Sequence, residues 1–249
     1  MTKPGSTIMA KIKTETVKIS VPETTLELLY SFPHEHNGQP LPTILVLHTW
    51  SGRDSFCCDK STYFATHGCL SIAVDLFGEA KVGKTREECQ NLIQPFINNR
   101  ITLKKRLEQI MEFVQKDARV DSSNTSAIGY CFGGLCVLDM VRNNLGLRSG
   151  VSIHGLLDKP NYKLPDTYSA KVLVVHGHKD PMVTPQHVAD FQTEMNRSVF
   201  DWQMVIFGQG MHAFTRPGTN DEISGLLYNP LLDQRTTKIV NNFLEEISQ

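Results

Sequence analysis

The chain has 249 residues, with 25 lysines and arginines against 26 aspartates and glutamates, which gives a formal net charge of −1. This balance argues against a nucleic acid or an anionic membrane surface as partner. No apolar run approaches the roughly 18 residues of a membrane helix, and residues 1–13 lack the apolar core of a secretory signal. The six cysteines contain no Cys-x-x-Cys pair, so we expect reduced thiols and a cytoplasmic location.

The first part of the chain predicts a hairpin and then alternating strands and helices. Residues 14–21 and 26–32 are short β-like runs, which indicates an antiparallel hairpin. Apolar runs at 43–48 and 70–75 are typical of buried strands, and residues 54–66 between them form a plausible helix. The order strand, helix, strand favours a parallel arrangement from residue 43 onward.

The middle of the chain contains two helical stretches, residues 85–93 and 101–116, and we expect Pro95 to interrupt them because proline breaks helices. A strand ending at Tyr130 and a helix from about Leu135 follow. The remaining predicted elements are strands at 151–154, 171–176 and 202–207 and helices at 184–197 and 231–247.

The domain organisation is simple. Residues 1–13 are interpreted as a flexible lead-in, and residues 14–249 as one α/β domain, because no composition break marks a linker. Near-continuous apolar strands alternating with amphipathic helices predict a mainly parallel sheet covered on both faces. Active sites of such sheets lie beyond the carboxyl ends of the strands, so the residues directly after each strand are the candidates for function.

The most informative segment is residues 126–134, which read Ser-Ala-Ile-Gly-Tyr-Cys-Phe-Gly-Gly. A strand, a very tight turn and a helix are predicted here, with Cys131 at the apex of the turn. Glycines on both sides avoid clashes with the helix and the neighbouring strands. This is the Gly-x-Ser-x-Gly nucleophile pattern with cysteine in place of serine, and a thiol at a helix N-terminus is favoured as thiolate.

Two further strand ends carry reactive residues. Asp180 follows the strand at 171–176, and His212 follows the strand at 202–207. The order nucleophile, acid, histidine is that of α/β-hydrolases. The imidazole would take or hold the thiol proton, and the carboxylate would fix its tautomer. A lone cysteine, aspartate or histidine is usually structural, but the three together at successive strand ends favour catalysis.

An oxyanion hole would use two backbone N–H groups. One belongs to Phe132, directly after the nucleophile, and the other lies in the loop after His48, at Trp50.

These motifs together resemble the dienelactone hydrolase family of α/β-hydrolases. The resemblance covers nearly the whole chain and rests on Gly-Tyr-Cys-Phe-Gly-Gly, His-Gly-His-Lys-Asp-Pro, Met-His-Ala-Phe-Thr-Arg-Pro and Val-Asp-Leu-Phe. It implies a mainly parallel sheet of about eight strands and a Cys131–His212–Asp180 triad. It also implies oxyanion donors at the amides of Trp50 and Phe132.

Three further positions compare with the founding enzymes. A substrate-binding arginine of the family matches Arg216, although a pairing of Arg216 with a carboxylate of the chain itself is the alternative. Thr49 stands where those enzymes have a glutamate that poises the thiol. We therefore expect Cys131 to pair directly with His212. Glu79 replaces another substrate-binding arginine, which argues against the diene lactone itself as substrate.

A competing motif occupies residues 78–85, which match the phosphate-binding pattern Gly-x-x-x-x-Gly-Lys-Thr. In a nucleotide-binding protein, Lys84 would contact the β- and γ-phosphates and Thr85 would bind Mg²⁺. Asp75, Leu76 and Phe77 separate this motif from its strand, whereas such loops normally follow the strand directly. A scaffold that keeps the fold without turnover is a further alternative.

The expected function is hydrolysis of a small ester or lactone through a thioester acyl-enzyme, with an esterase or thioesterase of unrelated specificity as the alternative. The triad requires no metal and no organic cofactor, and pairs such as His34 and His36 lack a third ligand at recognisable spacing. The expected partner is a small-molecule substrate, with no nucleic acid and no membrane, and the chain is expected to be a monomer or weak homodimer.

Overall fold

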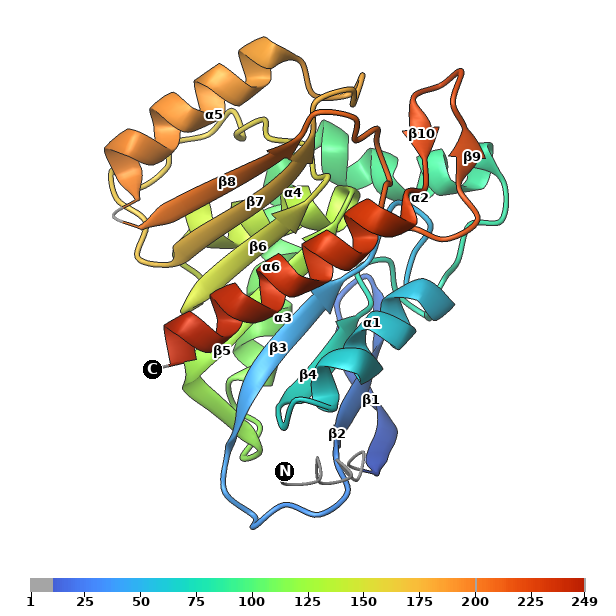
Figure 1. Ribbon diagram of the computed structural model, residues 1–249. Coiled ribbons are helices and arrows are strands. Elements are labelled where there is room, and N and C mark those ends of the chain that lie inside the picture. Colours follow the sequence, from blue (N-terminus) through green and yellow to red (C-terminus); the bar gives the residue numbers. More distant parts are fainter. Residues whose placement is uncertain (1–10, 200, 249) are drawn as a thin grey trace, which may run out of the picture.

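The computed structural model describes residues 11–199 and 201–248, which have an α/β fold (Figure 1). The strands are β1 (Ile12–Val21), β2 (Thr24–Pro33), β3 (Leu41–Leu47), β4 (Leu70–Val74), β5 (Val120–Tyr130), β6 (Ser149–Ile153), β7 (Lys171–Gly177), β8 (Trp202–Phe207), β9 (Asn220–Asp221) and β10 (Leu226–Leu227). The helices are α1 (Ser55–Ala65), α2 (Arg86–Asn98), α3 (Arg100–Val114), α4 (Phe132–Arg142), α5 (Pro185–Ser198) and α6 (Pro230–Ser248).

The central sheet has eight strands in the order β1-β2-β4-β3-β5-β6-β7-β8. β1 and β2 form the predicted antiparallel hairpin, and β2 joins β4 in antiparallel orientation. All pairings from β4 to β8 are parallel. The mainly parallel sheet is therefore confirmed, and the carboxyl ends of β3, β5, β7 and β8 lie at one edge.

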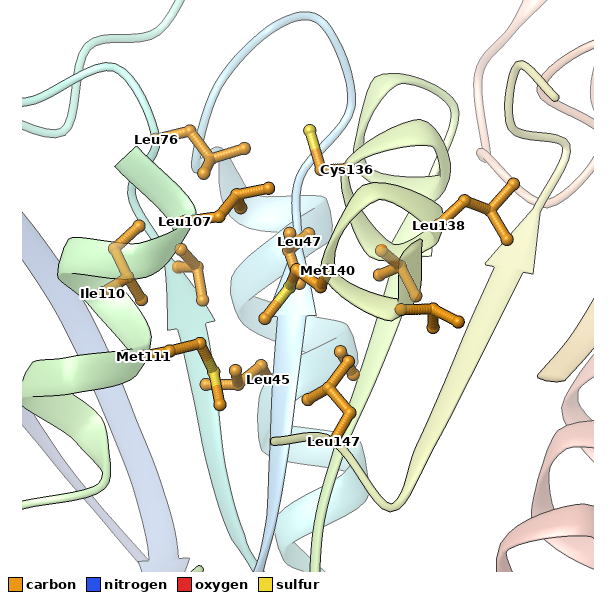
Figure 2. Close-up of a cluster of buried hydrophobic side chains, with 14 of the residues drawn as sticks. Leu45, Leu47, Leu76, Leu107, Ile110, Met111, Cys136, Leu138, Met140 and Leu147 are labelled. Atoms are coloured by element: carbon orange, nitrogen blue, oxygen red, sulfur yellow. The ribbon is translucent and has the colours of Figure 1, made fainter. Parts of the chain in front are cut away.

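Both faces of the sheet are covered, as expected, because its central strands are apolar on both sides. Leu45 and Leu47 of β3 pack into a cluster with α3 and α4 (Figure 2), whereas Ile44 and Val46 face the opposite cluster. That second cluster takes its helical residues from α1 and α6, which cross the near face of the sheet in Figure 1. The alternation follows from the period of two along a strand.

The prediction that Pro95 interrupts the helix is wrong. α2 continues through Pro95 to Asn98, because Phe96, the next residue, is buried in the core and this packing outweighs the backbone hydrogen bond that proline removes. The break falls at Asn99, whose backbone is extended and whose side chain accepts hydrogen bonds from the amides of Ile101 and Thr102. Asn99 therefore ends α2 and caps α3 at the same time.

Two other boundaries differ from those predicted. β1 begins at Ile12, inside the expected lead-in of residues 1–13, while residues 1–10 of that segment lie outside the described part of the chain. The short hairpin of β9 and β10 was not predicted, because two-residue strands leave no periodic signal.

A buried network of charges links three helices away from the strand ends. Arg142 of α4 is fully buried and donates hydrogen bonds to both carboxylate oxygens of Glu194 in α5. It also donates to the backbone oxygen of Leu157. Asp139, one turn earlier in α4, pairs with Arg100 of α3. Because each charge has partners, the burial of these groups is tolerated.

Among the described residues, no helix combines the length and apolar character needed to span a membrane.

Candidate active site

Cys131 lies at the apex of the turn between β5 and α4, where the chain was predicted to place it. Its φ of 56° falls in the left-handed region, which is strained for any residue with a side chain. The turn is held by the amide of Cys131, which donates to the backbone oxygen of Ile153. A Cβ at Gly129 would lie 2.0 Å from the backbone oxygen of Gly133, so only glycine fits at position 129.

Asp180 and His212 lie on the loops that follow β7 and β8, and backbone hydrogen bonds join the two loops. Lys179 donates its amide to the backbone oxygen of Gly210, and His178 donates its amide to the backbone oxygen of Phe207, the last residue of β8. These contacts fix the backbone of both loops relative to each other, so the two side chains can meet with little freedom.

The three predicted residues form a continuous hydrogen-bonded chain. Nδ1 of His212 lies 2.8 Å from Oδ2 of Asp180, and Nε2 of His212 lies 3.0 Å from the sulfur of Cys131. The other carboxylate oxygen of Asp180 accepts the amide of Met182. His212 and Asp180 are buried, whereas Cys131 is partly exposed. The imidazole of His212 therefore contacts the sulfur of Cys131 on one side and the carboxylate of Asp180 on the other.

The electrostatics of the pair favour a thiolate beside an imidazolium. Burial alone would raise the pKa of Cys131, but the charge and hydrogen bond of His212 and the backbone amides of Phe132 and Trp50 outweigh it. The pKa of Cys131 is therefore lowered. Burial would lower the pKa of His212, but the Cys131 sulfur and Asp180 raise it to about 10. The opposite directions of the two pKa shifts show that each charge stabilises the other.

In the loop after β3, the residues on either side of Trp50 take part in a closed ring of side-chain hydrogen bonds. The hydroxyls of Thr49 and Ser51 lie 2.9 Å apart, and Ser51 donates to Oδ2 of Asp54 at 3.0 Å. Arg216 closes the ring, because it donates to Thr49 at 3.1 Å and to the same oxygen of Asp54 at 2.6 Å. Arg216 thus pairs with a carboxylate of the chain itself, and its role in substrate binding stays a prediction.

A cavity of about 600 Å³ opens at Cys131. The predicted residues Trp50, Phe132, His212 and Arg216 all lie in its wall. Much of the remaining wall is apolar and comes from α2 and from single residues of other loops, namely Cys89, Ile93, Ile97, Leu156, Met182 and Leu226. The cavity can therefore hold a small, largely apolar molecule with its reacting atom at the sulfur.

Two buried histidines, His48 and His154, lie next to the candidate site and contact its loops. His48 accepts the amide of Leu76 at Nε2, so its Nδ1 carries the proton and donates to the backbone oxygen of Thr49. His154 lies edge-on to His212, with ring centroids 5.3 Å apart, and its Nε2 is 2.8 Å from the hydroxyl of Thr215. The sequence indicated that His48 and His154 lie at strand ends. It gave no sign of the contact between His154 and His212.

The phosphate-binding pattern of residues 78–85 does not form a phosphate cradle. The amides of Gly78 and Ala80 donate to the buried carboxylate of Asp75. The amides of Lys84 and Thr85 donate to Glu88. A nucleotide site of this kind needs those N–H groups free to face phosphate oxygens. Here they hold the loop in place as one wall of the cavity at Cys131.

The sequence was compared with families of known proteins. The family model described as "Dienelactone hydrolase family" matches residues 30–248. That match spans the sheet from β2 onward and includes every candidate residue named above.

The chain is also similar to individual proteins and to solved structures. An uncharacterised protein of Caenorhabditis elegans is 33% identical over 150 residues, which are 58% of this chain and 93% of that protein. A Yersinia pestis protein provisionally named as a carboxymethylenebutenolidase is 23% identical over 216 residues, covering 81% of this chain and 79% of that protein. A crystal structure of a dienelactone hydrolase-like promiscuous phosphotriesterase from metagenomic libraries aligns with a TM-score of 0.87 at 25% identity. That alignment covers 95% of this chain and 98% of that one.

Proposed function

The chain belongs to the dienelactone hydrolase family, and we propose that it hydrolyses a small ester or lactone with Cys131 as nucleophile, His212 as acid and base, and Asp180 as the residue that orients His212. The family and the relative named as a carboxymethylenebutenolidase support a carboxylic ester hydrolase. One observation carries the assignment of roles: the hydrogen-bonded chain from Cys131 through His212 to Asp180, which opens on a cavity.

In the first half of the reaction the Cys131 thiolate attacks the carbonyl carbon of the substrate. The carbonyl oxygen becomes an oxyanion, which the backbone amides of Trp50 and Phe132 stabilise. The carbon–oxygen bond to the leaving group then breaks, and the His212 imidazolium donates its proton to the departing alkoxide. The products of this half are the free alcohol and a thioester on Cys131.

In the second half His212 is neutral and takes a proton from water. The hydroxide attacks the thioester carbonyl at the same oxyanion site, and the carbon–sulfur bond breaks to release the carboxylic acid. The Cys131 thiolate and the His212 imidazolium are restored. Asp180 holds the ring so that Nε2 faces the sulfur throughout, and its negative charge stabilises the imidazolium.

The proposal is tested with a panel of aryl esters, thioesters and lactones. We expect turnover by the wild type and loss of turnover in Cys131→Ala. We also expect a mass increase equal to the acyl group on the Cys131 peptide of the wild type after rapid quenching. The matched control is Cys58→Ala, because Cys58 is a partly exposed thiol on α1 that does not line the cavity. Wild-type turnover no greater than that of Cys131→Ala on every substrate would disprove the proposal.

A further inference from the structure

The hydrogen-bonded ring of Thr49, Ser51, Asp54 and Arg216 lies beside Trp50, whose backbone amide faces the sulfur of Cys131. Thr49 and Ser51 directly flank Trp50, and both hydroxyls belong to the ring. Both are buried, with exposed fractions of 3% and 6%. The orientation of the Trp50 peptide is therefore set by side chains on either side of it.

The ring is anchored to two separate parts of the fold. Oδ1 of Asp54 accepts the amide of Cys57 and so caps α1. Oδ2 of Asp54 accepts from Ser51 and Arg216. Arg216 arrives from the loop after His212, 162 residues further along the chain, and its guanidinium also lies over the ring of Phe56. A shift of either anchor would move the Trp50 amide relative to the sulfur.

The same contacts neutralise the charge of Arg216. Its guanidinium forms an ion pair with Asp54 at 2.6 Å, and the side chains of the two residues are only 29% and 13% exposed. A carboxylate on a substrate would have to compete with Asp54 for this guanidinium. Two other cations, Lys84 and Arg86, also line the cavity at the start of α2.

We propose that Arg216 is a positioning residue, which holds the Trp50 amide toward Cys131 through Thr49 and Asp54, and that the substrate is uncharged on the side of Cys131 that faces Arg216. This inference rests on the proposed ester hydrolysis for its kinetic consequence, but its electrostatic part concerns the resting protein alone. Arg216 then acts on every substrate equally, and Asp54 keeps it from serving as a carboxylate subsite.

The electrostatic part is tested without turnover. Cys131 is alkylated with iodoacetate and with iodoacetamide, which differ in charge but little in size, and the ratio of the two rates is measured on the Cys131 peptide. Asp54→Asn retains a helix cap and uncovers the Arg216 charge, so we expect the iodoacetate-to-iodoacetamide ratio to rise roughly threefold or more. Asp59→Asn is the control, because it makes the same change of charge at an exposed position of α1. If the ratio is unchanged in Asp54→Asn, the inference that Asp54 neutralises the charge of Arg216 is overturned.

The positioning part is tested with two p-nitrophenyl esters of matched shape. The hydrogen succinate ester carries a carboxylate, and the isocaproate ester has an isopropyl group in its place. In Arg216→Met we expect kcat to fall roughly tenfold to a hundredfold for both esters with little change in KM, because an oxyanion donor is misplaced. A loss confined to the succinate ester and expressed in KM overturns the proposal, because Arg216 would then bind the substrate carboxylate.

The two experiments separate this inference from the proposed function. If neither ester is hydrolysed above the level of Cys131→Ala, ester hydrolysis is disproved for these substrates, while the alkylation ratio still decides whether Asp54 neutralises Arg216. Arg216→Lys gives a further check. It keeps the charge but cannot contact Thr49 and Asp54 with two separate nitrogen atoms, so we expect it to recover only part of the lost kcat.

Discussion

Nε2 of His212 lies 3.0 Å from the sulfur of Cys131, with no carboxylate between them. Thr49, which stands where the founding enzymes of the family have a glutamate, has its hydroxyl in contact with Ser51 and Arg216 instead. The protonation of the thiol is therefore governed by its direct contact with the imidazole. The behaviour of this pair with pH follows from that contact.

The first prediction concerns alkylation of Cys131 by iodoacetamide as a function of pH. The pKa of Cys131 is lowered and that of His212 is raised to about 10, so the thiolate–imidazolium pair is populated between them. Below the Cys131 pKa the sulfur is protonated and the rate falls. We expect a plateau that is reached below pH 8.5, the region where an unassisted thiol titrates. A rate that still climbs through that pH contradicts the ion pair.

The second prediction concerns Asp180→Asn. An amide at this position can no longer stabilise the imidazolium and can hold the ring in the wrong tautomer. We expect kcat for a good ester substrate to fall by roughly a hundredfold to ten-thousandfold. The pKa of Cys131 measured by alkylation should rise at the same time, because His212 loses the charge that raises its own pKa. Asp190→Asn, a change at an exposed position of α5, is the control and should leave both quantities unaltered.

The third prediction concerns Gly129→Ala at the end of β5. The added Cβ would lie 2.0 Å from the backbone oxygen of Gly133, so the turn that carries Cys131 must shift. We expect the free energy of unfolding to fall by about 3 kcal/mol or more, measured by chemical denaturation. Gly208→Ala makes the same change where nothing lies within 4 Å and should have little effect. Equal stability of the two variants would show that the turn at Cys131 tolerates a side chain at position 129.

The fourth prediction concerns the buried network of Arg142. In Glu194→Gln the fully buried guanidinium loses the carboxylate that accepts two of its hydrogen bonds. Removing one partner of a buried ion pair typically costs about 3–5 kcal/mol of unfolding free energy. Glu112→Gln removes an exposed carboxylate that pairs with Lys116 on α3, and this variant should unfold at the denaturant concentration of the wild type. If Glu194→Gln and Glu112→Gln unfold at the same denaturant concentration, the Arg142 network does not stabilise the fold.

The arrangement of the candidate site could be predicted from the sequence because parallel strands bring their carboxyl ends to one edge. Cys131, Asp180 and His212 each follow a strand that is recognisable by its apolar run, so their meeting required only the correct fold class. The direct contact between Cys131 and His212 was likewise expected, since Thr49 cannot take the proton of the thiol.

Other contacts could not be predicted, because they join residues with no shared periodicity. The ion pair of Asp54 and Arg216 spans 162 positions, and the edge-on contact of His154 with His212 depends on the packing of two loops. The helical continuation through Pro95 is a case where tertiary packing outweighs local preference. The sequence of residues 78–85 also could not show whether their backbone amides are free. Only the structure reveals that Asp75 and Glu88 accept hydrogen bonds from them.

The walls of the cavity and its reacting end belong to different parts of the fold. α2 and the β9–β10 hairpin, which supply much of the wall, lie outside the eight-stranded sheet, whereas Cys131, Asp180 and His212 stand on loops that follow its strands. Mutations in α2 can therefore change the shape of the cavity while Cys131, Asp180 and His212 keep their positions. The part of the protein that would set the choice of substrate is thus separate from the part that would carry out the proposed reaction.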